Sequence, residues 1–184
     1  MTTTTFDANA AQKKLDAAIT PTRSLVFYTL TATLPILVIT GVLLFWRSLG
    51  RTGLVTLATI GAITGLVGLG RLLYEMTLDI AGFPDYKLPI WAVFFLIIYL
   101  ISGFAFFFFG VHMAAPGSSF NGFATDPRAA FLDATYLSLC DYIAVAPDPS
   151  ITLKTQGMRY ATVIQGFLSL FINLVIITKF VNSF

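Results

Sequence analysis

Four long runs of apolar residues constrain the fold of this chain more than any other feature of its sequence. The hydrocarbon core of a bilayer is about 30 Å thick, so a helix needs about 20 mostly apolar residues to cross it. Four segments meet that requirement, namely residues 24–46, 53–74, 89–111 and 158–180. We therefore expect an all-α integral membrane protein with four transmembrane helices.

The composition agrees with a membrane protein and excludes several functional classes. Charged residues make up 11% of the 184 residues and mean hydropathy is +0.83, whereas soluble domains are about a quarter charged. One cysteine and one histidine provide neither a disulfide nor a zinc cluster, so we expect no metal and no cofactor. A scattered net charge of +2 argues against nucleic acid as a partner. Without a catalytic constellation or a glycine-rich phosphate loop, we do not expect an enzyme.

The polar N-terminal segment, residues 1–23, is expected to be cytoplasmic because it has no apolar signal-peptide core. An even number of spans puts both termini on one side of the membrane. The eleven Lys and Arg residues divide six to five between the two sides, so the positive-inside rule does not decide the orientation. From the polar N-terminus we predict a multi-pass protein of the cell membrane with both termini in the cytoplasm and with lipid around it.

The connection between the third and fourth spans contains a helix that is too short to cross. Residues 112–123, "HMAAPGSSFNGF", have the composition of a loop. In "DPRAAFLDATYLSLCDY", Asp126 is a good N-cap and Pro127 occupies the favoured first helical position. A helix of this length extends only about 25 Å and carries three further charged residues, so we expect it to enter the membrane and return. The following residues 144–151 would be non-helical backbone that is buried in protein or lines a water-filled cavity.

One face of the last apolar run is polar. At 100° per residue, four of its side chains fall within an arc of roughly 80°, and these are Thr162, Gln165, Ser169 and Asn173. They could form hydrogen bonds between helices, each of which contributes only about 0.6 kcal/mol on average. They could instead line an aqueous path. We favour the pore-lining interpretation, because the polar face follows directly on a segment that is expected to re-enter the membrane.

Residues 88–184 resemble the two-helix pore domain of the tetrameric potassium-channel superfamily, as found in its bacterial members. "FLDATYLSL" is similar to the family's pore helix. "RYATVIQGFLSLFINLVIITKFV" is similar to its inner helix, with Arg159 at the usual start and Lys179 at the usual end. Ser169 takes the place of the family's gating-hinge glycine. The resemblance implies an outer helix, a re-entrant pore helix, a filter-like loop and an inner helix in a homotetrameric ion channel. Residues 24–87 would be two peripheral transmembrane helices and a linker.

The filter-like loop departs from the family pattern. The family's filter reads T-V-G-Y-G-D, and its glycines let backbone carbonyls replace the hydration shell of potassium. Counting forward from Ser138 places residues 144–149 there, and counting back from Arg159 places residues 145–150. Neither stretch contains a glycine, and prolines restrict φ to about −65°. The filter-like loop is Ala144, Val145, Ala146, Pro147, Asp148, Pro149 and Ser150. Selectivity for potassium by the family's mechanism is therefore not expected.

Two acidic residues near this loop are candidates for attracting cations. Four copies of Asp148 around a symmetry axis would form an acidic ring. The alternative is an ordinary turn acid, since "PDP" is common loop chemistry. Asp141 falls at the C-terminal end of the short helix, which disfavours a negative charge. It should therefore face water or have a partner such as Lys154 or Arg159.

Two functions remain open from the sequence. The first is a weakly selective cation channel, a homotetramer with inorganic cations as the permeant species. The second is a non-conducting subunit that serves the assembly or regulation of a larger membrane complex. We favour the channel, because a polar face on the last helix has no use in a sealed pore.

Several other residues have simpler expected roles. We expect His112 to be an interfacial residue rather than a proton relay. Cys140 is expected to be a packing residue rather than a nucleophile, since no His or Lys is near it in sequence. Arg71 and Glu75, four residues apart, are expected to pair. The closely spaced Gly61, Gly65 and Gly68 should let a neighbouring helix approach closely.

Overall fold

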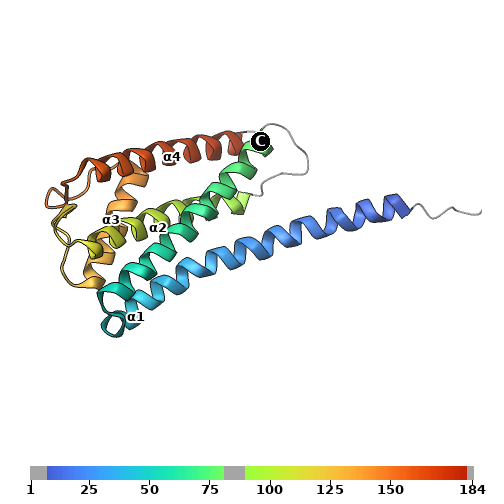
Figure 1. Ribbon diagram of the computed structural model, residues 1–184. Helices are drawn as coiled ribbons and strands as arrows, with labels where there is room; N and C mark the ends of the chain where they lie inside the picture. The colour runs from blue at the N-terminus through green and yellow to red at the C-terminus, as the bar shows by residue number, and fades with distance from the viewer. Residues whose placement is uncertain (1–7, 81–89, 182–184) are drawn as a thin grey trace, which may run out of the picture.

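The computed structural model describes the backbone of residues 8–80 and 90–181, and the side chains of 37, 38, 41, 44, 45, 47–78 and 94–178. The described chain is mostly helical (Figure 1). Its helices are α1 (Ala8–Ile80), α2 (Ile90–Ala114), α3 (Pro127–Ile143) and α4 (Gln156–Val181). Two short strands, β1 (Phe120–Asn121) and β2 (Thr152–Leu153), form an antiparallel pair.

Helix α1 is divided into two arms at Gly50. This residue has φ 61° and ψ 177°, a conformation that glycine adopts far more easily than other residues. The chain reverses there, so the second arm leads back along the direction from which the first arm came (Figure 1). The turn falls in the polar gap that the sequence leaves between its first two apolar runs.

Three described segments are long and apolar enough to cross a membrane: Arg47–Leu78, Phe94–Ala114 and Gln156–Thr178. They correspond to the predicted spans 53–74, 89–111 and 158–180, and they confirm a multi-pass, all-α membrane protein. The predicted span 24–46 lies within the helical backbone of α1, but most of its side chains lie outside the described residues. Residues 1–7 of the N-terminal segment and 81–87 of the predicted linker also lie outside them.

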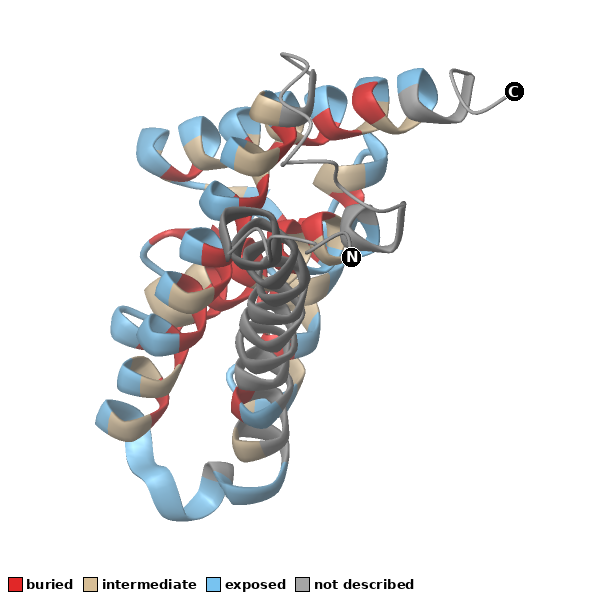
Figure 2. Cartoon of the chain, turned by 90° about the vertical axis from the view of Figure 1, so that its right-hand side faces the viewer, coloured by how far each residue is buried: buried red, intermediate tan, exposed pale blue. Residues whose placement is uncertain are grey.

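The second arm of α1 packs against α2 through small residues. A Cβ atom placed on Gly65 would lie 2.7 Å from the Cα atom of Gly103, so the two backbones are in direct contact there. One on Gly61 would lie 2.7 Å from the ring of Phe106. The prediction that these glycines admit a neighbouring helix is therefore confirmed. Buried residues gather where the helices face one another (Figure 2).

Arg51 ties the turn of α1 to the end of α2. Its Nε donates a hydrogen bond of 2.7 Å to the carbonyl of Met113, and its guanidinium also donates to the carbonyl of Ala114. The last carbonyls of a helix have no partner within the helix, so a cationic donor here satisfies them and complements the helix dipole. This contact fixes the α1 turn beside the loop that leads to α3.

Candidate functional site

Capping residues at its two ends determine where helix α3 begins and ends. The side chain of Asp126 accepts a hydrogen bond of 3.2 Å from the Ala129 N–H, and Pro127 is the first helical residue, as predicted. At the other end, Ala144 adopts the left-handed conformation with φ 55°, and its N–H bonds to the Cys140 carbonyl. The left-handed cap stops the helix and turns the chain into the predicted filter-like loop.

The C-terminal end of α3 lies about halfway along α4. Ser169 donates a 2.5 Å hydrogen bond to the carbonyl of Tyr142, in the last turn of α3. Ser169 follows Gln156, the first residue of α4, by thirteen residues, which corresponds to about 20 Å along the helix axis. Helix α3 therefore extends well into the depth of the segments that are long enough to cross a membrane.

The chain after α3 returns to the end from which it came. Lys154 N–H donates a 2.9 Å hydrogen bond to the carbonyl of Ser119, and β1 pairs with β2 beside that contact. Gly122 packs so closely that a Cβ atom there would lie 2.2 Å from the Ser150 carbonyl oxygen. The loop before α3 and the loop after it are thus bound together, next to the end of α2 and the start of α4.

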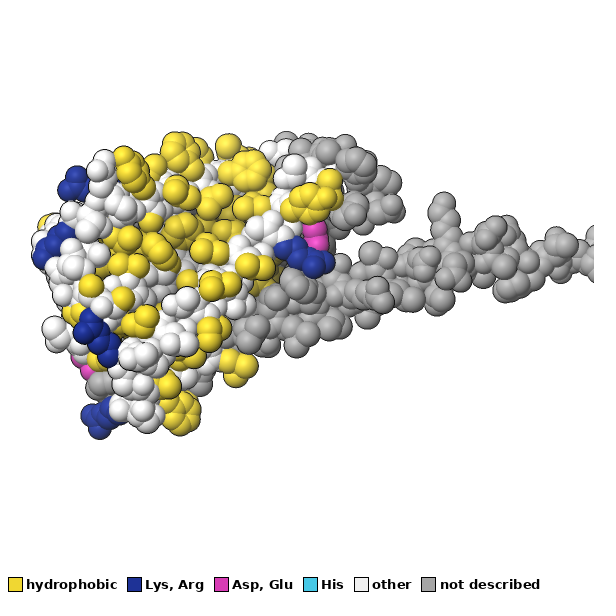
Figure 3. Space-filling model, viewed as in Figure 1, with side chains coloured by type: hydrophobic (Ala, Val, Ile, Leu, Met, Phe, Trp, Pro, Cys, Tyr) yellow, Lys and Arg dark blue, Asp and Glu magenta, His cyan; other side chains and the backbone are white. Residues whose placement is uncertain are grey.

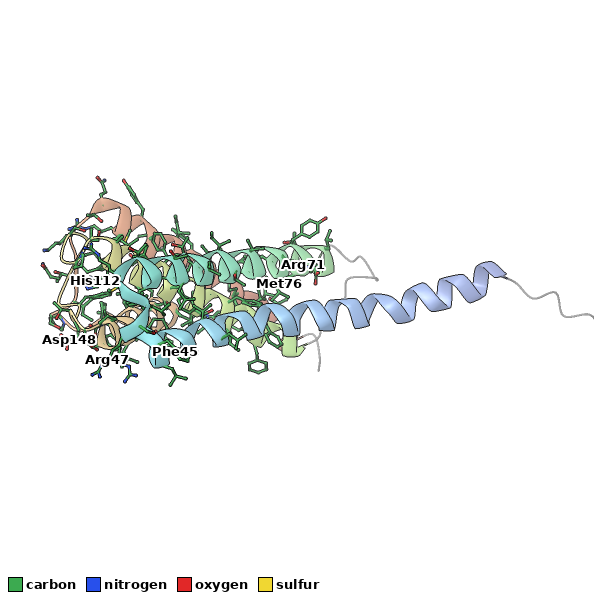
Figure 4. All side chains as sticks on the ribbon, turned by 60° about the horizontal axis from the view of Figure 1, so that its bottom comes forward. Phe45, Arg47, Arg71, Met76, His112 and Asp148 are labelled. Atoms are coloured by element: carbon green, nitrogen blue, oxygen red, sulfur yellow. The ribbon has the colours of Figure 1, made fainter. Side chains whose placement is uncertain are left out.

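The filter-like loop, residues 144–150, is largely exposed on the single chain. Residues 145–148 have no regular secondary structure, and only Pro147 is half-buried while the others are exposed. Asp148 lies at the same end of the molecule as His112 and Arg47, away from Arg71 (Figure 4). Among the apolar members of the loop, Val145 is 54% exposed.

Asp148 also stabilises the turn that follows it. The Ser150 N–H donates a 2.8 Å hydrogen bond to Asp148 Oδ1, and the Ile151 N–H donates one to the Asp148 carbonyl. Hydrogen bonds from the side chain and the backbone of Ser150 lower the pKa of Asp148. The carboxylate is consequently both a turn acid and a charge that persists at neutral pH.

Two of the four residues predicted to line a pore are instead buried between helices. Gln165 is fully buried, and its Nε2 donates to the carbonyl and to the Oγ of Ser138 at 2.8 and 2.7 Å. Ser138 in turn donates a 2.9 Å hydrogen bond to the carbonyl of Ile101 in α2. Ser169 is 3% exposed and donates to α3. Gln165 and Ser169 therefore form hydrogen bonds between helices within this chain.

The other two predicted residues are only partly buried. Thr162 donates a 3.0 Å hydrogen bond to the Arg159 carbonyl in its own helix. Asn173 Oδ1 accepts a 3.0 Å hydrogen bond from the Tyr142 hydroxyl, which again joins α4 to α3. The exposed side chains between these two positions and just beyond are all apolar: Val163, Ile164, Phe167, Leu170, Phe171, Leu174 and Ile177. The polar face of α4 is thus mainly the face that packs on α3.

Asp141 lacks the basic partner that the sequence predicted. Lys154 Nζ donates to the Gly117 carbonyl at 2.6 Å, and Arg159 donates to the Leu153 carbonyl at 3.5 Å. The Asp141 Oδ2 atom is buried and has no hydrogen-bond partner. Neither residue forms an ion pair with Asp141, because both are held by carbonyls near the start of α4. The other alternative, that Asp141 faces water, stays a prediction.

Basic side chains gather at the end of the molecule that carries the loops (Figure 3). They come from the turn of α1, the start of α3 and the start of α4, and they are Arg47, Arg51, Arg128, Lys154 and Arg159. At the other end, Arg71 and Glu75 form the predicted ion pair at 3.2 Å. Asp148 is therefore a negative group on a surface that is otherwise mostly positive.

His112 lies near the end of α2 that leads into the loops, and its side chain belongs to the core. Its predicted place at the membrane interface stays a prediction. The histidine is 3% exposed, with its ring centroid 5.2 Å from that of Phe123. Its Nε2 lies 3.1 Å from the carbonyl of Ala124, whose N–H donates to Asp133 at 2.8 Å. Loop residues fold over this histidine and bury it, which hydropathy alone does not reveal. Cys140 is buried, as expected of a packing residue.

No protein-family model, curated protein or solved structure matches this chain. Its function must therefore be inferred from its own geometry.

Proposed function

We propose that this protein is a weakly selective cation channel, a homotetramer in which four filter-like loops surround a central axis. The observation that carries the proposal is the course of the chain between α2 and α4. Helix α3 leads inward to about half the length of α4, and residues 144–151 lead back to the end where α3 began. A short helix followed by an exposed return loop is the arrangement by which pore-loop channels place a filter on their axis.

Exposed apolar side chains support assembly around that axis. One face of α3 carries Leu132, Tyr136, Leu139 and Ile143, which are 61, 43, 43 and 53% exposed. Because α3 does not span the membrane, this face would not be fully covered by lipid tails. An unpartnered apolar surface beside a polar loop is typical of a protein–protein contact. In the proposed tetramer, neighbouring subunits cover this face and bring the four loops together.

The arrangement in the membrane completes the proposal. The first arm of α1 is the fourth transmembrane helix, α1 lies at the periphery, and both termini are cytoplasmic. The loop end, with Asp148, then faces outward. The exposed Asp148 carboxylates attract cations, while the surrounding basic residues weaken that attraction and reduce the conductance. The loop selects poorly between potassium and sodium because it contains no glycine, and its prolines exclude a ladder of inward-pointing carbonyls.

One observation favours the second candidate, a non-conducting subunit of a larger membrane complex. Gln165 and Ser169 donate their hydrogen bonds to α3, and the exposed residues of α4 from 163 to 177 are apolar. If these residues surrounded the axis, the path would be lined by hydrocarbon, and such constrictions close by expelling water. The choice between the two candidates therefore depends on whether ions pass.

Cation flux into liposomes tests the proposal. The purified wild type should admit both potassium and sodium, and Asp148→Asn should reduce the flux severalfold, because it removes one negative charge per subunit close to the ion. Asp126→Asn is the matched control, since it removes one charge from the same end while asparagine keeps the helix cap. A tetramer that admits no cation under any ionic or pH condition would leave the non-conducting subunit. A strong preference for potassium would contradict the proposed filter chemistry.

A further inference from the structure

Asp141 is an acidic residue in a place that disfavours negative charge. It lies in the last turn of α3, where the helix dipole is negative and where no basic residue is present. Its neighbour Tyr142 contacts α4 about 20 Å from the start of that helix, close to the middle of a membrane-spanning segment. A charged carboxylate at such a depth needs a compensating positive charge, or it must be neutralised.

The described part of the chain provides no such charge. The ion pair between Arg71 and Glu75 lies at the other end of the molecule and does not involve Asp141. Arg159, near the start of α4, lies ten residues before Ser169, or about 15 Å along the helix. Arg128 begins α3 and is separated from Asp141 by almost the whole helix. Any compensating positive charge must therefore come from outside the described residues.

A cavity of about 210 Å³ lies beside Asp141, between the end of α3 and α4. The cavity is partly open, and Asp141, Tyr142, Ser169 and Asn173 supply its polar lining. The larger, apolar part of its lining includes Ile143, Ala144, Gly166 and Leu170. The Ser169 hydroxyl donates its hydrogen to the Tyr142 carbonyl, and the Tyr142 hydroxyl donates its hydrogen to Asn173 Oδ1. Both hydroxyl hydrogens are thus already used, so the two hydroxyl oxygens and Asn173 Oδ1 have lone pairs to offer a ligand, while Asn173 Nδ2 remains a donor. A carboxylate beside several neutral oxygen acceptors suits a hard cation.

We propose that this cavity binds one partly hydrated alkali-metal cation in each chain, with the Asp141 carboxylate as its charged ligand. Asn173 Oδ1, Ser169 Oγ and the last carbonyls of α3 supply neutral oxygen ligands. A monovalent ion fits because one carboxylate balances one charge, and no group of three acidic, His or Cys side chains lies together among the described residues. A water molecule occupies about 30 Å³ in the liquid, so the cavity has room for a cation with several waters.

The inference goes beyond the proposed function, because all the proposed ligands of the cation belong to one chain and none of them is Asp148. It assigns the cation a structural role at the junction of α3 and α4, where it neutralises an acid that would otherwise oppose the negative end of α3. The site needs neither conduction nor a ring of Asp148 residues.

Equilibrium binding of radioactive rubidium, a potassium analogue, tests the inference on the assembled protein in lipid nanodiscs. The background electrolyte is a large organic cation at pH 7, and Asp148→Asn is present throughout, so that ions bound at the loop do not contribute. We expect saturable binding of one rubidium ion per chain. Adding Asp141→Asn should weaken it roughly tenfold or more, and adding Asn173→Ala should weaken it less. Asp126→Asn, added as a control, should leave it unchanged.

Three results would overturn the inference. The first is an absence of saturable rubidium binding at pH 7, which would mean that a proton neutralises Asp141. The second is equal binding with and without Asp141→Asn. The third is unchanged rubidium binding by the Asn173→Ala variant. This result decides the question if the Asp141→Asn variant does not assemble. Rubidium binding by a protein that shows no cation flux would remove the channel function and keep this site, and flux without binding would do the reverse.

Discussion

The contact between α1 and α2 and the contact between α3 and α4 are built on opposite principles. Glycines bring the first pair of helices together until their backbones touch at Gly65 and Gly103. The second pair is joined by hydrogen bonds that Gln165 and Ser169 donate to α3 and by one that Asn173 accepts from it. Lipid tails are as apolar as leucine, so helices in a membrane associate through close packing or through polar contacts rather than through hydrophobic burial. This chain uses each solution in a different place.

The reason for the division lies in the nature of α3. Helices α1 and α2 are long, and their own hydrogen bonds satisfy their backbones, so close packing is sufficient. Helix α3 ends at about half the depth of α4, and its last carbonyls have no partner within the helix. Ser169 satisfies one of these carbonyls directly, and Gln165 binds Ser138 one turn earlier. Polar side chains on α4 therefore stabilise a helix end that would otherwise be buried without partners.

The largest loss of stability is expected from a substitution where the backbones of α1 and α2 touch. Gly65→Leu places a side chain where the Gly103 Cα atom lies 2.7 Å from an added Cβ, so α1 and α2 must separate. Overpacking usually costs 1–3 kcal/mol, and backbone contact puts this substitution at about 3 kcal/mol or above. The measurement is the thermal unfolding midpoint together with the elution profile of the purified protein.

Gly70→Leu is the matched control for that substitution. Gly70 is on the same arm of α1, it is exposed, and a Cβ atom there would meet nothing within 4 Å. Leucine should stabilise the helix slightly, because glycine is a poor helix former. Equal destabilisation by both variants would show that loss of glycine itself, and not contact between α1 and α2, determines the result.

A smaller effect is expected between α3 and α4. Gln165→Leu keeps a similar volume and removes two hydrogen bonds to Ser138, while it also removes Gln165 Oε1, which is buried without a partner. We expect a loss of about 1 kcal/mol, within the range measured for polar contacts in membranes. A double-mutant cycle with Ser138→Ala should show coupling between the two residues, whereas Thr162→Val should show none. A change in cation flux without a change in stability would instead restore Gln165 as a pore-lining residue.

The sequence predicted the first kind of contact better than the second. Glycine spacing has one main use in a membrane helix, so Gly61 and Gly65 could be assigned correctly to close packing. The N-cap Asp126 and the length of α3 could also be predicted from the sequence, because helix capping depends on residues that are close together in the chain. A polar face on a helix is ambiguous, because the same residues serve a neighbouring helix or a channel of water. The hydrogen bonds that Gln165 and Ser169 donate to α3 could not be distinguished from pore lining for that reason.

Contacts between distant segments could not be read from the sequence. Arg51 lies 62 residues before Met113, and nothing near it in the chain indicates that it caps α2. The surroundings of His112 are apolar only because Phe123 and the loop fold over it. The partner expected for Asp141 was chosen from basic residues nearby in sequence. Carbonyl groups compete for those residues, and that competition is a property of the folded chain.

The smallest loss of stability is expected for a hydrogen bond that water can reach. It should be smaller than the loss for a hydrogen bond that is buried away from water. The Tyr142 hydroxyl donates a 3.0 Å hydrogen bond to Asn173, and both residues line the cavity beside Asp141. Tyr142→Phe removes this bond, but water or an ion in the cavity can then take up the free Asn173 oxygen. We expect a loss of about 0.5 kcal/mol, at the low end for a hydrogen bond and below the loss for Gln165→Leu.

Tyr160→Phe is the control, because its hydroxyl bonds to Gln156 on the exposed surface and should contribute almost nothing. The comparison is made on unfolding midpoints in the same lipid. A Tyr142→Phe variant that loses more stability than Gln165→Leu would mean that the cavity is dry, since only then would the unpaired Asn173 oxygen carry its full desolvation cost.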